Sequence, residues 1–318
     1  MLSRHADQAV LLGAAHAGQR LVAVGERGIV LLSDDQGRHW RQVGVPVSVT
    51  LTAVAFADEK TGYAVGHGGV VLSTNDGGQT WVKRLDGLQA ARIALESARD
   101  ETSRTNAERL LAEGADKPFL DLHVFDARRA VVVGAYGLAF ETRDGGQTWQ
   151  SWMDRVPDPK GLHLYAIRSL GDAMLIAGEQ GLVCRSDDGG ATFKRLDTGY
   201  KGSFFTAELP SPTEMLVGGL RGNLWRTTDA GATWSHIAVA APVSLTASAR
   251  RPDGGVLFFD QAGAVYSVHD GQALRLGAAL PPVNGAISLD DGGLLVLSFK
   301  GAVPLPAAAL RAGTEVTR

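Results

Sequence analysis

Residues 63–81 read YAVGHGGVVLSTNDGGQTW. The stretch contains two short apolar runs separated by glycines, and it closes with an eight-residue box of the form Ser/Thr-x-Asp-x-Gly-x-Thr-Trp. The box occurs at residues 33–40, 74–81, 142–149, 186–193 and 227–234, and a weaker sixth copy follows at residues 267–274. A motif that returns in register along a chain indicates a repeat architecture, in which each copy builds one structural unit.

A glycine hairpin precedes each box and occurs once more without a box. Its second glycine lies at Gly28, Gly69, Gly137, Gly181, Gly222, Gly263 and Gly301. Most of these positions are about 41 residues apart, the length of one four-stranded propeller blade. In the second repeat we expect strands at residues 51–56, 62–66, 70–73 and 80–85, joined by tight turns. The sequence therefore predicts an all-β fold, a seven-bladed β-propeller that forms a single domain over residues 1–318.

One step between hairpins is 68 residues and marks a helical insertion at residues 87–117, between blades 2 and 3. Residues 88–113 lack glycine and proline, so we expect two short helices with a break at residues 100–106. The apolar faces of these helices are Leu88, Ala91, Leu95 and Ala98, and then Ala107, Leu110 and Leu111. The faces either pack on each other and on the propeller, or they dock a partner.

The seventh repeat has the glycine hairpin but no box. Its outer strand must come from elsewhere, because propellers close by pairing strands from the two chain ends, which removes an exposed edge. Residues 305–310 and the first residues of the chain are the two candidates.

The overall composition restricts partners and chemistry. A net charge of −3 and a pI near 6.2 provide no global basic field, so we expect no nucleic-acid binding. Cys184 is the only cysteine, which excludes an internal disulfide and a cysteine metal cluster. The first apolar run, residues 9–15, is too short to span a bilayer. We expect a monomer that is not itself membrane-spanning.

The box residues are expected to be structural. Their carboxylates would accept N–H groups of their own turn, and their aromatic side chains would pack between sheets. The carboxylates are Asp35, Asp76, Asp144, Asp188 and Asp229, and the aromatic positions are Trp40, Trp81, Trp149, Phe193 and Trp234.

No pattern in the sequence indicates a catalytic site, a cofactor or a metal. The motifs His-Glu-x-x-His, Gly-x-Ser-x-Gly and Gly-x-Gly-x-x-Gly are missing, and the eight histidines have no ligand spacing. Sialidases share the box, but their Arg-Ile-Pro segment is missing here and no pair of inward acids stands out from the repeat. A glycan-binding or glycoside-hydrolase (sialidase-like) propeller is the alternative to a non-enzymatic function.

The glycine hairpin followed by a DGGxTW box, as in residues 63–81, resembles the photosystem II stability/assembly factor family and its relatives in non-photosynthetic bacteria. The resemblance covers almost the whole chain. It implies seven blades, no catalytic activity and a scaffold that helps to assemble membrane or envelope protein complexes through an arginine-rich face. It also implies the periplasm or another exported compartment, with the signal absent from this chain; a cytoplasmic location is the alternative.

In a four-stranded blade, the turns between the second and third strands emerge on one face, together with the connections between blades, and the boxes lie on the other face. The first face combines arginine and aromatic residues, which protein interfaces favour. We expect partner contacts there at Arg27, His67, Tyr136, Gln180, Tyr200, Lys201, Arg221, Phe299 and Lys300. Residues 155–160 are expected to join them, with the helical insertion as a raised rim.

Overall fold

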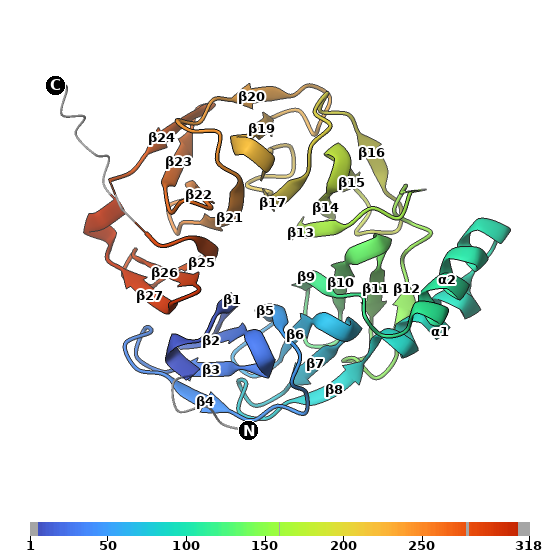
Figure 1. Cartoon of the computed structure of the whole chain (residues 1–318). Coiled ribbons are helices and arrows are strands. Elements are labelled where there is room, and N and C mark those ends of the chain that lie inside the picture. The colour runs from blue at the N-terminus through green and yellow to red at the C-terminus, as the bar shows by residue number, and fades with distance from the viewer. Residues whose placement is uncertain (1–5, 159, 278–279, 311–318) are drawn as a thin grey trace.

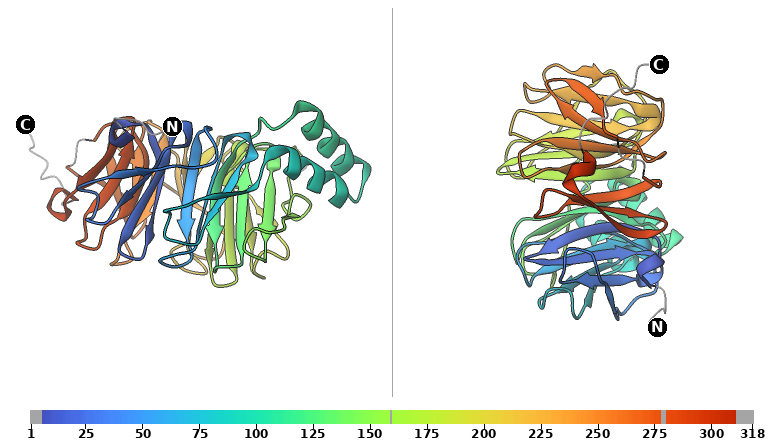
Figure 2. Two further views of the ribbon diagram at one scale, coloured as in Figure 1. Left: turned by 90° about the horizontal axis from the view of Figure 1, so that it is seen from below. Right: turned by 90° about the vertical axis from the view of Figure 1, so that its left-hand side faces the viewer.

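The seven repeats fold into seven antiparallel sheets arranged in a ring (Figure 1). The computed structural model describes residues 6–158, 160–277 and 280–310. Seen edge-on, the ring is a flat disc with a pair of helices outside its rim (Figure 2). The prediction of a seven-bladed β-propeller with a helical insertion between blades 2 and 3 is confirmed.

In each blade the strands follow one another in chain order from the centre of the ring outward (Figure 1). Blades 1 to 3 contain β1 (Leu11–Ala17), β2 (Arg20–Gly25), β3 (Val30–Ser33), β4 (Arg41–Val43); β5 (Leu51–Phe56), β6 (Gly62–Gly66), β7 (Val71–Thr74), β8 (Val82–Leu85); β9 (Phe119–Val124), β10 (Ala130–Gly134), β11 (Ala139–Thr142) and β12 (Gln150–Ser151). Blades 4 to 7 contain β13 (Leu164–Leu170), β14 (Ala173–Gly178), β15 (Val183–Ser186), β16 (Lys194–Leu196); β17 (Phe204–Glu208), β18 (Met215–Gly219), β19 (Leu224–Thr227), β20 (Ser235–Ile237); β21 (Leu245–Arg250), β22 (Val256–Asp260), β23 (Val265–His269), β24 (Gln272–Arg275); and β25 (Val283–Ser288), β26 (Leu294–Ser298) and β27 (Gly301–Leu305).

The apolar runs of each repeat become the second and third strands of a blade. In blade 2, β5 and β6 have the predicted bounds, and all residues of β6 are buried because neighbouring sheets cover both of its faces. β8 begins at Val82, two residues later than predicted, because Thr80 and Trp81 belong to the box turn.

The inner strands share one irregularity that shapes the central channel. The pairing of each inner strand with its neighbour skips the second residue, as between Leu51 and Ala53 in β5. A bulge of this kind re-aims a side chain. The skipped residues all line the channel, namely Leu12, Thr52, Leu120, Tyr165, Phe205, Thr246 and Asn284.

Five box turns have one hydrogen-bond pattern. In blade 3, Thr142 Oγ1 donates to Asp144 Oδ1 at 2.9 Å and accepts the Gly146 N–H at 2.9 Å. Asp144 also accepts the backbone N–H of Thr148 at 2.9 Å and its hydroxyl at 2.6 Å. Trp149 is buried between blades 2 and 3. The carboxylate thus closes its own turn.

The sixth copy, residues 267–274, does not form this turn. Ser267 pairs with Leu274 and His269 with Gln272, so a two-residue hairpin connects the strands. Asp270 and Gly271 have φ angles of 47° and 76°, which a tight hairpin requires. This weak copy lacks the box turn because His269 occupies the position of the box aspartate.

The insertion forms α1 (Gly87–Ser97) and α2 (Glu101–Glu113), and the break between them is shorter and earlier than residues 100–106. Asp100 caps α2, since its side chain accepts Ser103 N at 2.7 Å while Ser103 Oγ accepts Asp100 N at 3.2 Å. Because of this capping box, α2 begins directly after Asp100.

The helices pack on the propeller through alanine and leucine. The buried residues of the pair are Ala90, Ala91, Ala94, Ala107 and Leu110, and they share a cluster with blades 2 and 3. Leu88, part of the predicted apolar face, is 41% exposed. The packing alternative therefore holds for most of the predicted apolar face.

Blade 7 has three strands within the described residues. The proposed closing strand at residues 305–310 is wrong: Leu305 ends β27, and Ala307–Leu310 form a 3-10 turn whose Leu310 is buried against blade 7. Residues Ala6–Gln8 lie beside β27, where a Cβ on Gly301 would overlap Asp7 O. The other candidate for the closing strand of blade 7 is the start of the chain, and residues 1–5 of it lie outside the described residues.

Candidate functional site

One face of the disc, here called the tip face, carries the turns between the second and third strands and the connections between blades. Backbone hydrogen bonds join the two sets, as from Glu26 N to Val10 O at 3.0 Å. The box turns instead bond the turns between first and second strands, as from Gly77 N to Lys60 O at 3.0 Å. The boxes therefore lie on the opposite face.

The nine predicted contact residues are on the tip face, and all but one are exposed. The exception is Tyr200, which is half-buried and whose hydroxyl donates to Leu220 O at 3.0 Å. The nine residues come from six blades around the ring, and no single cluster unites them. Partner contact at these positions stays a prediction.

Four tip residues have the left-handed backbone conformation that favours glycine. The φ angles are 53° at Arg27, 57° at Tyr136, 50° at Gln180 and 57° at Arg221. Gly68, at the same position in blade 2, has a φ of 70°. A side chain costs about 1–2 kcal/mol in this region. Strained backbone conformations of this kind cluster at functional sites in proteins.

One residue of the expected face lies elsewhere. Arg155 lies toward the outer wall of the ring, where its Nη1 donates to Gly190 O of the blade 4 box turn at 3.2 Å. Lys160 does reach the tip face, with Nζ 3.4 Å from Gln180 Oε1. The helices lie outside the ring beside β12, because their buried alanines pack on the blade wall (Figures 1 and 2). The start of α1 also contacts the blade 2 tip turn at residues 67–69. That the helices act as a raised rim of the binding face stays a prediction.

A row of aromatic contacts on the tip face was missed by sequence reasoning. The ring centroids are 4.9 Å apart for Tyr136 and His163, 6.0 Å for His163 and Tyr165, and 5.2 Å for Tyr165 and Phe205. We call these four residues the aromatic strip. It leads from the blade 3 tip to the channel. Alignment of the repeats could have indicated Tyr165 and Phe205, since both occupy the skipped position of an inner strand.

The channel holds a charged cluster that the sequence did not reveal. Arg168 Nη1 lies 2.6 Å from Asp121 Oδ2, and Arg168 Nε lies 4.0 Å from Glu208 Oε1. Ser248 Oγ donates to Glu208 Oε1 at 2.6 Å. Two acids therefore face the channel, although no such pair stands out from the repeat. The residues come from three inner strands. Arg168 and Glu208 occupy the same position in their repeats, but charged residues do not recur there in the other blades, so the period gave no sign of the cluster.

Electrostatics bind this cluster together. Burial raises the pKa of the Glu208 carboxyl, although Arg168 acts in the opposite direction. Burial alone would lower the pKa of Arg168, but Asp121 and Glu208 outweigh it and the pKa is raised. Glycosidases place two acids against the substrate. Here the guanidinium lies between the acids, an arrangement that neutralises charge and suits a structural tie between blades 3, 4 and 5.

The described residues contain no group of three His, Cys, Asp or Glu side chains that could hold a metal ion. No described helix is long and apolar enough to cross a membrane. Burial raises the pKa of the Cys184 thiol to about 12, so it is protonated at neutral pH.

Comparisons with known proteins agree with this architecture. The solved structure of YCF48 from Cyanidioschyzon merolae matches with a TM-score of 0.71 at 14% identity, covering 95% of this chain and 97% of that one. The WD40 β-propeller domain of Doa1 matches with a TM-score of 0.65 at 12% identity, covering 94% and 93%. At these identities the likeness concerns the fold alone.

The fold and the repeated boxes define a seven-bladed β-propeller of the Asp-box, or bacterial neuraminidase repeat, class. A family model described as photosynthesis system II assembly factor YCF48 matches residues 32–99 and 100–274, and the chain belongs to that family. The photosystem II assembly lipoprotein Ycf48 of Synechococcus sp. (strain CC9902) is 35% identical over 77 residues, which is 24% of this chain and 23% of that relative. The match therefore spans about a quarter of the curated relative's length.

Proposed function

We propose that this chain is a non-catalytic, monomeric scaffold that binds a protein partner and acts as an assembly or stability factor for a membrane or envelope protein complex. Membership of the assembly-factor family supports the general role. The partner and the binding face are inferences from this chain's own surface.

The observation that carries the proposal is the composition of the tip face. The aromatic strip lies beside Lys117, whose Nζ is 4.9 Å from the Tyr136 ring centroid. Arg27 and Arg221 project from strained turns on the same face. Aromatic and arginine side chains provide much of the binding energy at protein interfaces. Aromatic surface of this kind, held on a rigid ring, suits recognition of a folded partner.

An exported compartment, such as the periplasm, fits a partner of this kind. The Synechococcus relative is described as a lipoprotein, which supports a site of action at a membrane surface. Fractionation of source cells tests this part of the proposal, and recovery in the cytoplasm alone would contradict it.

The test is the combined substitution Arg27→Ala, Tyr136→Ala and Arg221→Ala. We expect it to leave folding nearly unchanged and to abolish co-purification of the partner complex from source cells in mild detergent. The matched control is Arg38→Ala, Gln79→Ala and Gln147→Ala, three exposed residues of the box face. Retention of the same partner by the tip-face variant would refute the face assignment.

A glycan-binding or glycoside-hydrolase function is the second candidate. The observation that favours it is the presence of Tyr165 and Phe205 in the same channel as Asp121 and Glu208. We expect no turnover of fluorogenic sialosides or other glycosides, because Arg168 engages both acids. Turnover that Asp121→Asn or Glu208→Gln abolishes would replace the scaffold proposal with an enzymatic one.

A further inference from the structure

The aromatic strip on the tip face, Tyr136, His163, Tyr165 and Phe205, has a chemistry that narrows the kind of partner segment it can bind. Each of its residues is exposed or half-buried. Successive ring planes are inclined by 49°, 52° and 75°, so the row presents ring faces and ring edges in turn and is not flat. Compact apolar groups of a partner can therefore fit between the rings.

The strip connects two hollows. At its outer end Tyr136 lines a cavity of about 480 Å³ beneath the helices, together with Met153 and Leu110. At its inner end Tyr165 and Phe205 line the channel, where the cavity is about 330 Å³. A segment that follows the strip from one hollow to the other lies extended across blades 3, 4 and 5.

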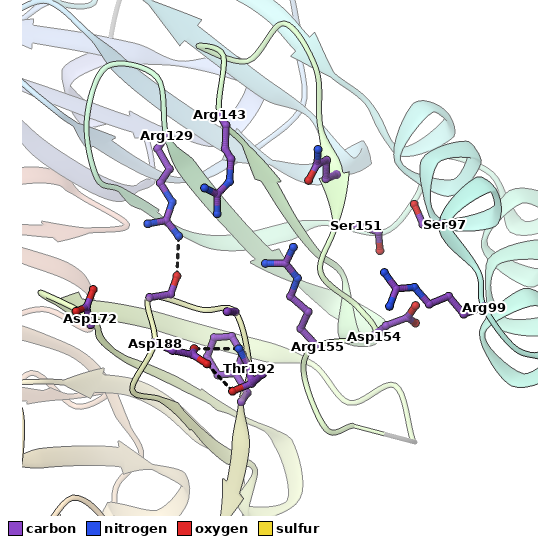
Figure 3. A pocket seen from close by; sticks show the side chains of 14 residues that line it. Ser97, Arg99, Arg129, Arg143, Ser151, Asp154, Arg155, Asp172, Asp188 and Thr192 are labelled. Atoms are coloured by element: carbon purple, nitrogen blue, oxygen red, sulfur yellow. Dashed lines mark hydrogen bonds between the residues drawn. The ribbon is translucent and has the colours of Figure 1, made fainter.

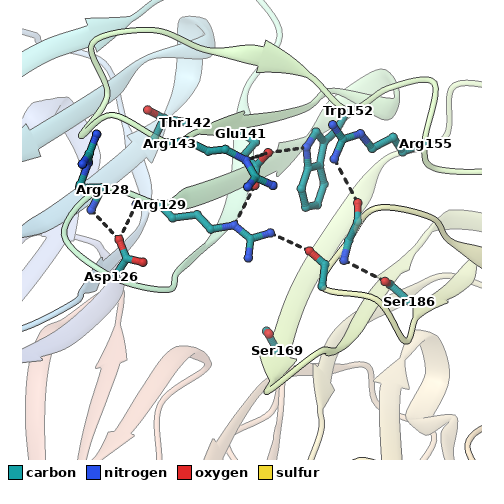
Figure 4. A network of polar contacts seen from close by, with 12 residues as sticks. Asp126, Arg128, Arg129, Glu141, Thr142, Arg143, Trp152, Arg155, Ser169 and Ser186 are labelled. Atoms are coloured by element: carbon teal, nitrogen blue, oxygen red, sulfur yellow. Dashed lines mark hydrogen bonds and ion pairs between the residues drawn. The ribbon is translucent and has the colours of Figure 1, made fainter.

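The connection between β12 and β13, which leads to His163, is anchored where it begins. Trp152 Nε1 donates to the buried carboxylate of Glu141 at 3.2 Å, and Arg155 Nη1 donates to Gly190 O at 3.2 Å (Figure 4). Figure 3 shows Arg155 between the helices and the blade 4 box turn. The connection thus leaves the outer wall from a fixed point.

The inner end of this connection is fixed to the blade 3 tip. Gly137 N donates to Leu162 O at 2.8 Å, and Leu162 N donates to Asp158 Oδ2 at 2.5 Å. The bulge in β13 then directs Tyr165 to the channel. Because these contacts hold the rings in place, a partner does not have to order the strip before binding it.

The strip carries hydroxyl groups that are not engaged. The hydroxyls of Tyr136 and Tyr165 form no hydrogen bond within residues 6–158, 160–277 and 280–310. The other three tyrosines, Tyr63, Tyr200 and Tyr266, each donate to a protein oxygen. The two unengaged phenols of the chain therefore lie together on the strip, where they can donate to a ligand.

The charged groups around the strip are paired. His163 Nδ1 lies 3.1 Å from Glu179 Oε2, which also accepts the backbone N–H of His163 at 2.9 Å. Lys117, at the outer end of the strip, lies 2.6 Å from Asp116 Oδ1 and 2.9 Å from Glu113 Oε2. The strip thus offers aromatic surface and hydroxyl donors with little unmatched charge, which suits an uncharged ligand.

We propose that the aromatic strip binds an extended, uncharged, proline-rich segment of the partner in the polyproline II conformation. Proline has no N–H, so a run of prolines offers carbonyl acceptors without donors, and the hydroxyls of Tyr136 and Tyr165 complement them. Aromatic-lined grooves recognise this helix because it is preformed and loses little entropy on binding. The inference rests on the proposed function, since it gives the chemistry of the partner segment that contacts the tip face.

The probe for the test is fluorescein-labelled decaproline, and a labelled Gly-Ser repeat of equal length is the control peptide. Fluorescence anisotropy with the full chain should detect binding of decaproline and none of the Gly-Ser peptide. Tyr136→Phe with Tyr165→Phe removes only the two unengaged hydroxyls and should weaken binding about tenfold. Tyr165→Ala with Phe205→Ala removes the ring surface and should abolish binding.

Phe299→Ala is the matched control variant, because Phe299 is an aromatic residue of the tip face outside the strip and is 48% exposed. It should bind decaproline like the original chain, and so should Arg27→Ala with Arg221→Ala. Three results would overturn the proposal: no binding of decaproline, equal binding of the Gly-Ser peptide, or unchanged affinity in the Tyr136→Phe and Tyr165→Phe variant. That variant should keep the original melting temperature, so its loss of affinity reports on the hydroxyls.

The outcome is separable from that of the proposed function. If decaproline does not bind while the Arg27, Tyr136 and Arg221 variant loses its partner, the strip inference fails and the tip face remains the binding face. If decaproline binds through the strip while that variant keeps its partner, the face assignment fails and the strip stands as a proline-binding site.

Discussion

The environment of His123 in the closed ring changes the pKa of its imidazole. It lies on β9, edge-on to Phe125 with 4.6 Å between ring centroids. Burial, and then the nearby Arg168, lower the pKa of His123 from 6.5 to about 4. The folded chain therefore keeps this imidazole neutral over a pH range in which the unfolded chain protonates it.

We expect the melting temperature to depend on His123 between pH 6.5 and 4. The unfolded state binds one more proton than the folded state in this window, so the contribution is complete above pH 6.5 and is lost as the pH falls. Thermal unfolding of His123→Phe should lose less stability across the window than the original chain. The exposed His269→Gln serves as the control and should follow the original slope. Equal slopes for His123→Phe and the original chain would contradict the assignment.

At the scale of elements, the box hairpins and the insertion show two ways in which short-range bonds define a segment. Five boxes close through an aspartate that accepts the N–H groups of its own turn, and the hydrogen bonds from Thr227 and Thr233 lower the pKa of Asp229 to about 2. The capping box of Asp100 likewise sets the start of α2. Neither device requires a contact with a partner, which is why we regard the boxes as structural.

Asp144→Ala tests this view of the boxes. Loss of the bonds to Thr142 and Thr148 should lower the free energy of unfolding by about 1 kcal/mol, the low end for an unsatisfied turn, because the carboxylate is only partly buried. Calorimetry should record the decrease, while partner capture at low temperature stays intact. Glu108→Ala, on the exposed side of α2, should change stability by less than about 0.5 kcal/mol. Loss of capture without loss of stability would make Asp144 a binding residue.

At the scale of the whole molecule, the ring is joined where the chain ends meet. Asn284 Nδ2 donates to Leu11 O at 3.0 Å, and His16 Nε2 lies 2.7 Å from Ser288 O, so blades 7 and 1 are tied along the channel. Gly301 lies against Asp7 at the rim of the same junction. We expect residues 1–318 to unfold as a single domain, because each blade buries its faces only against its neighbours.

Gly301→Ala and Gly254→Ala form a matched pair that tests this junction. The two glycines have nearly equal positive φ angles, 89° and 86°, so alanine meets a similar backbone penalty at each. A Cβ at Gly254 meets no atom within 4 Å, whereas at Gly301 it overlaps Asp7 O. Gly301→Ala should therefore reduce the melting temperature clearly more in calorimetry. Equal reductions would mean that the contact between the chain start and blade 7 does not stabilise the ring.

The features of this protein that depend on local bonding and on the repeat period can be predicted from the amino-acid sequence. The boxes, the glycine turns and the apolar runs specify strands within one repeat, and their spacing specifies seven blades; β5 and β6 lie where the pattern predicts them. The positions of the tip-face residues follow from the same period.

The contacts between repeats became visible only in the folded ring. The Asp121, Arg168 and Glu208 cluster and the aromatic strip each join side chains from different blades, and the residue types at these positions differ from repeat to repeat. The path of α1 and α2 outside the ring was also hidden, because an apolar helix face specifies burial but not the surface that covers it. Local propensity acts over a few residues, whereas these sites depend on how neighbouring sheets twist and pack around the ring.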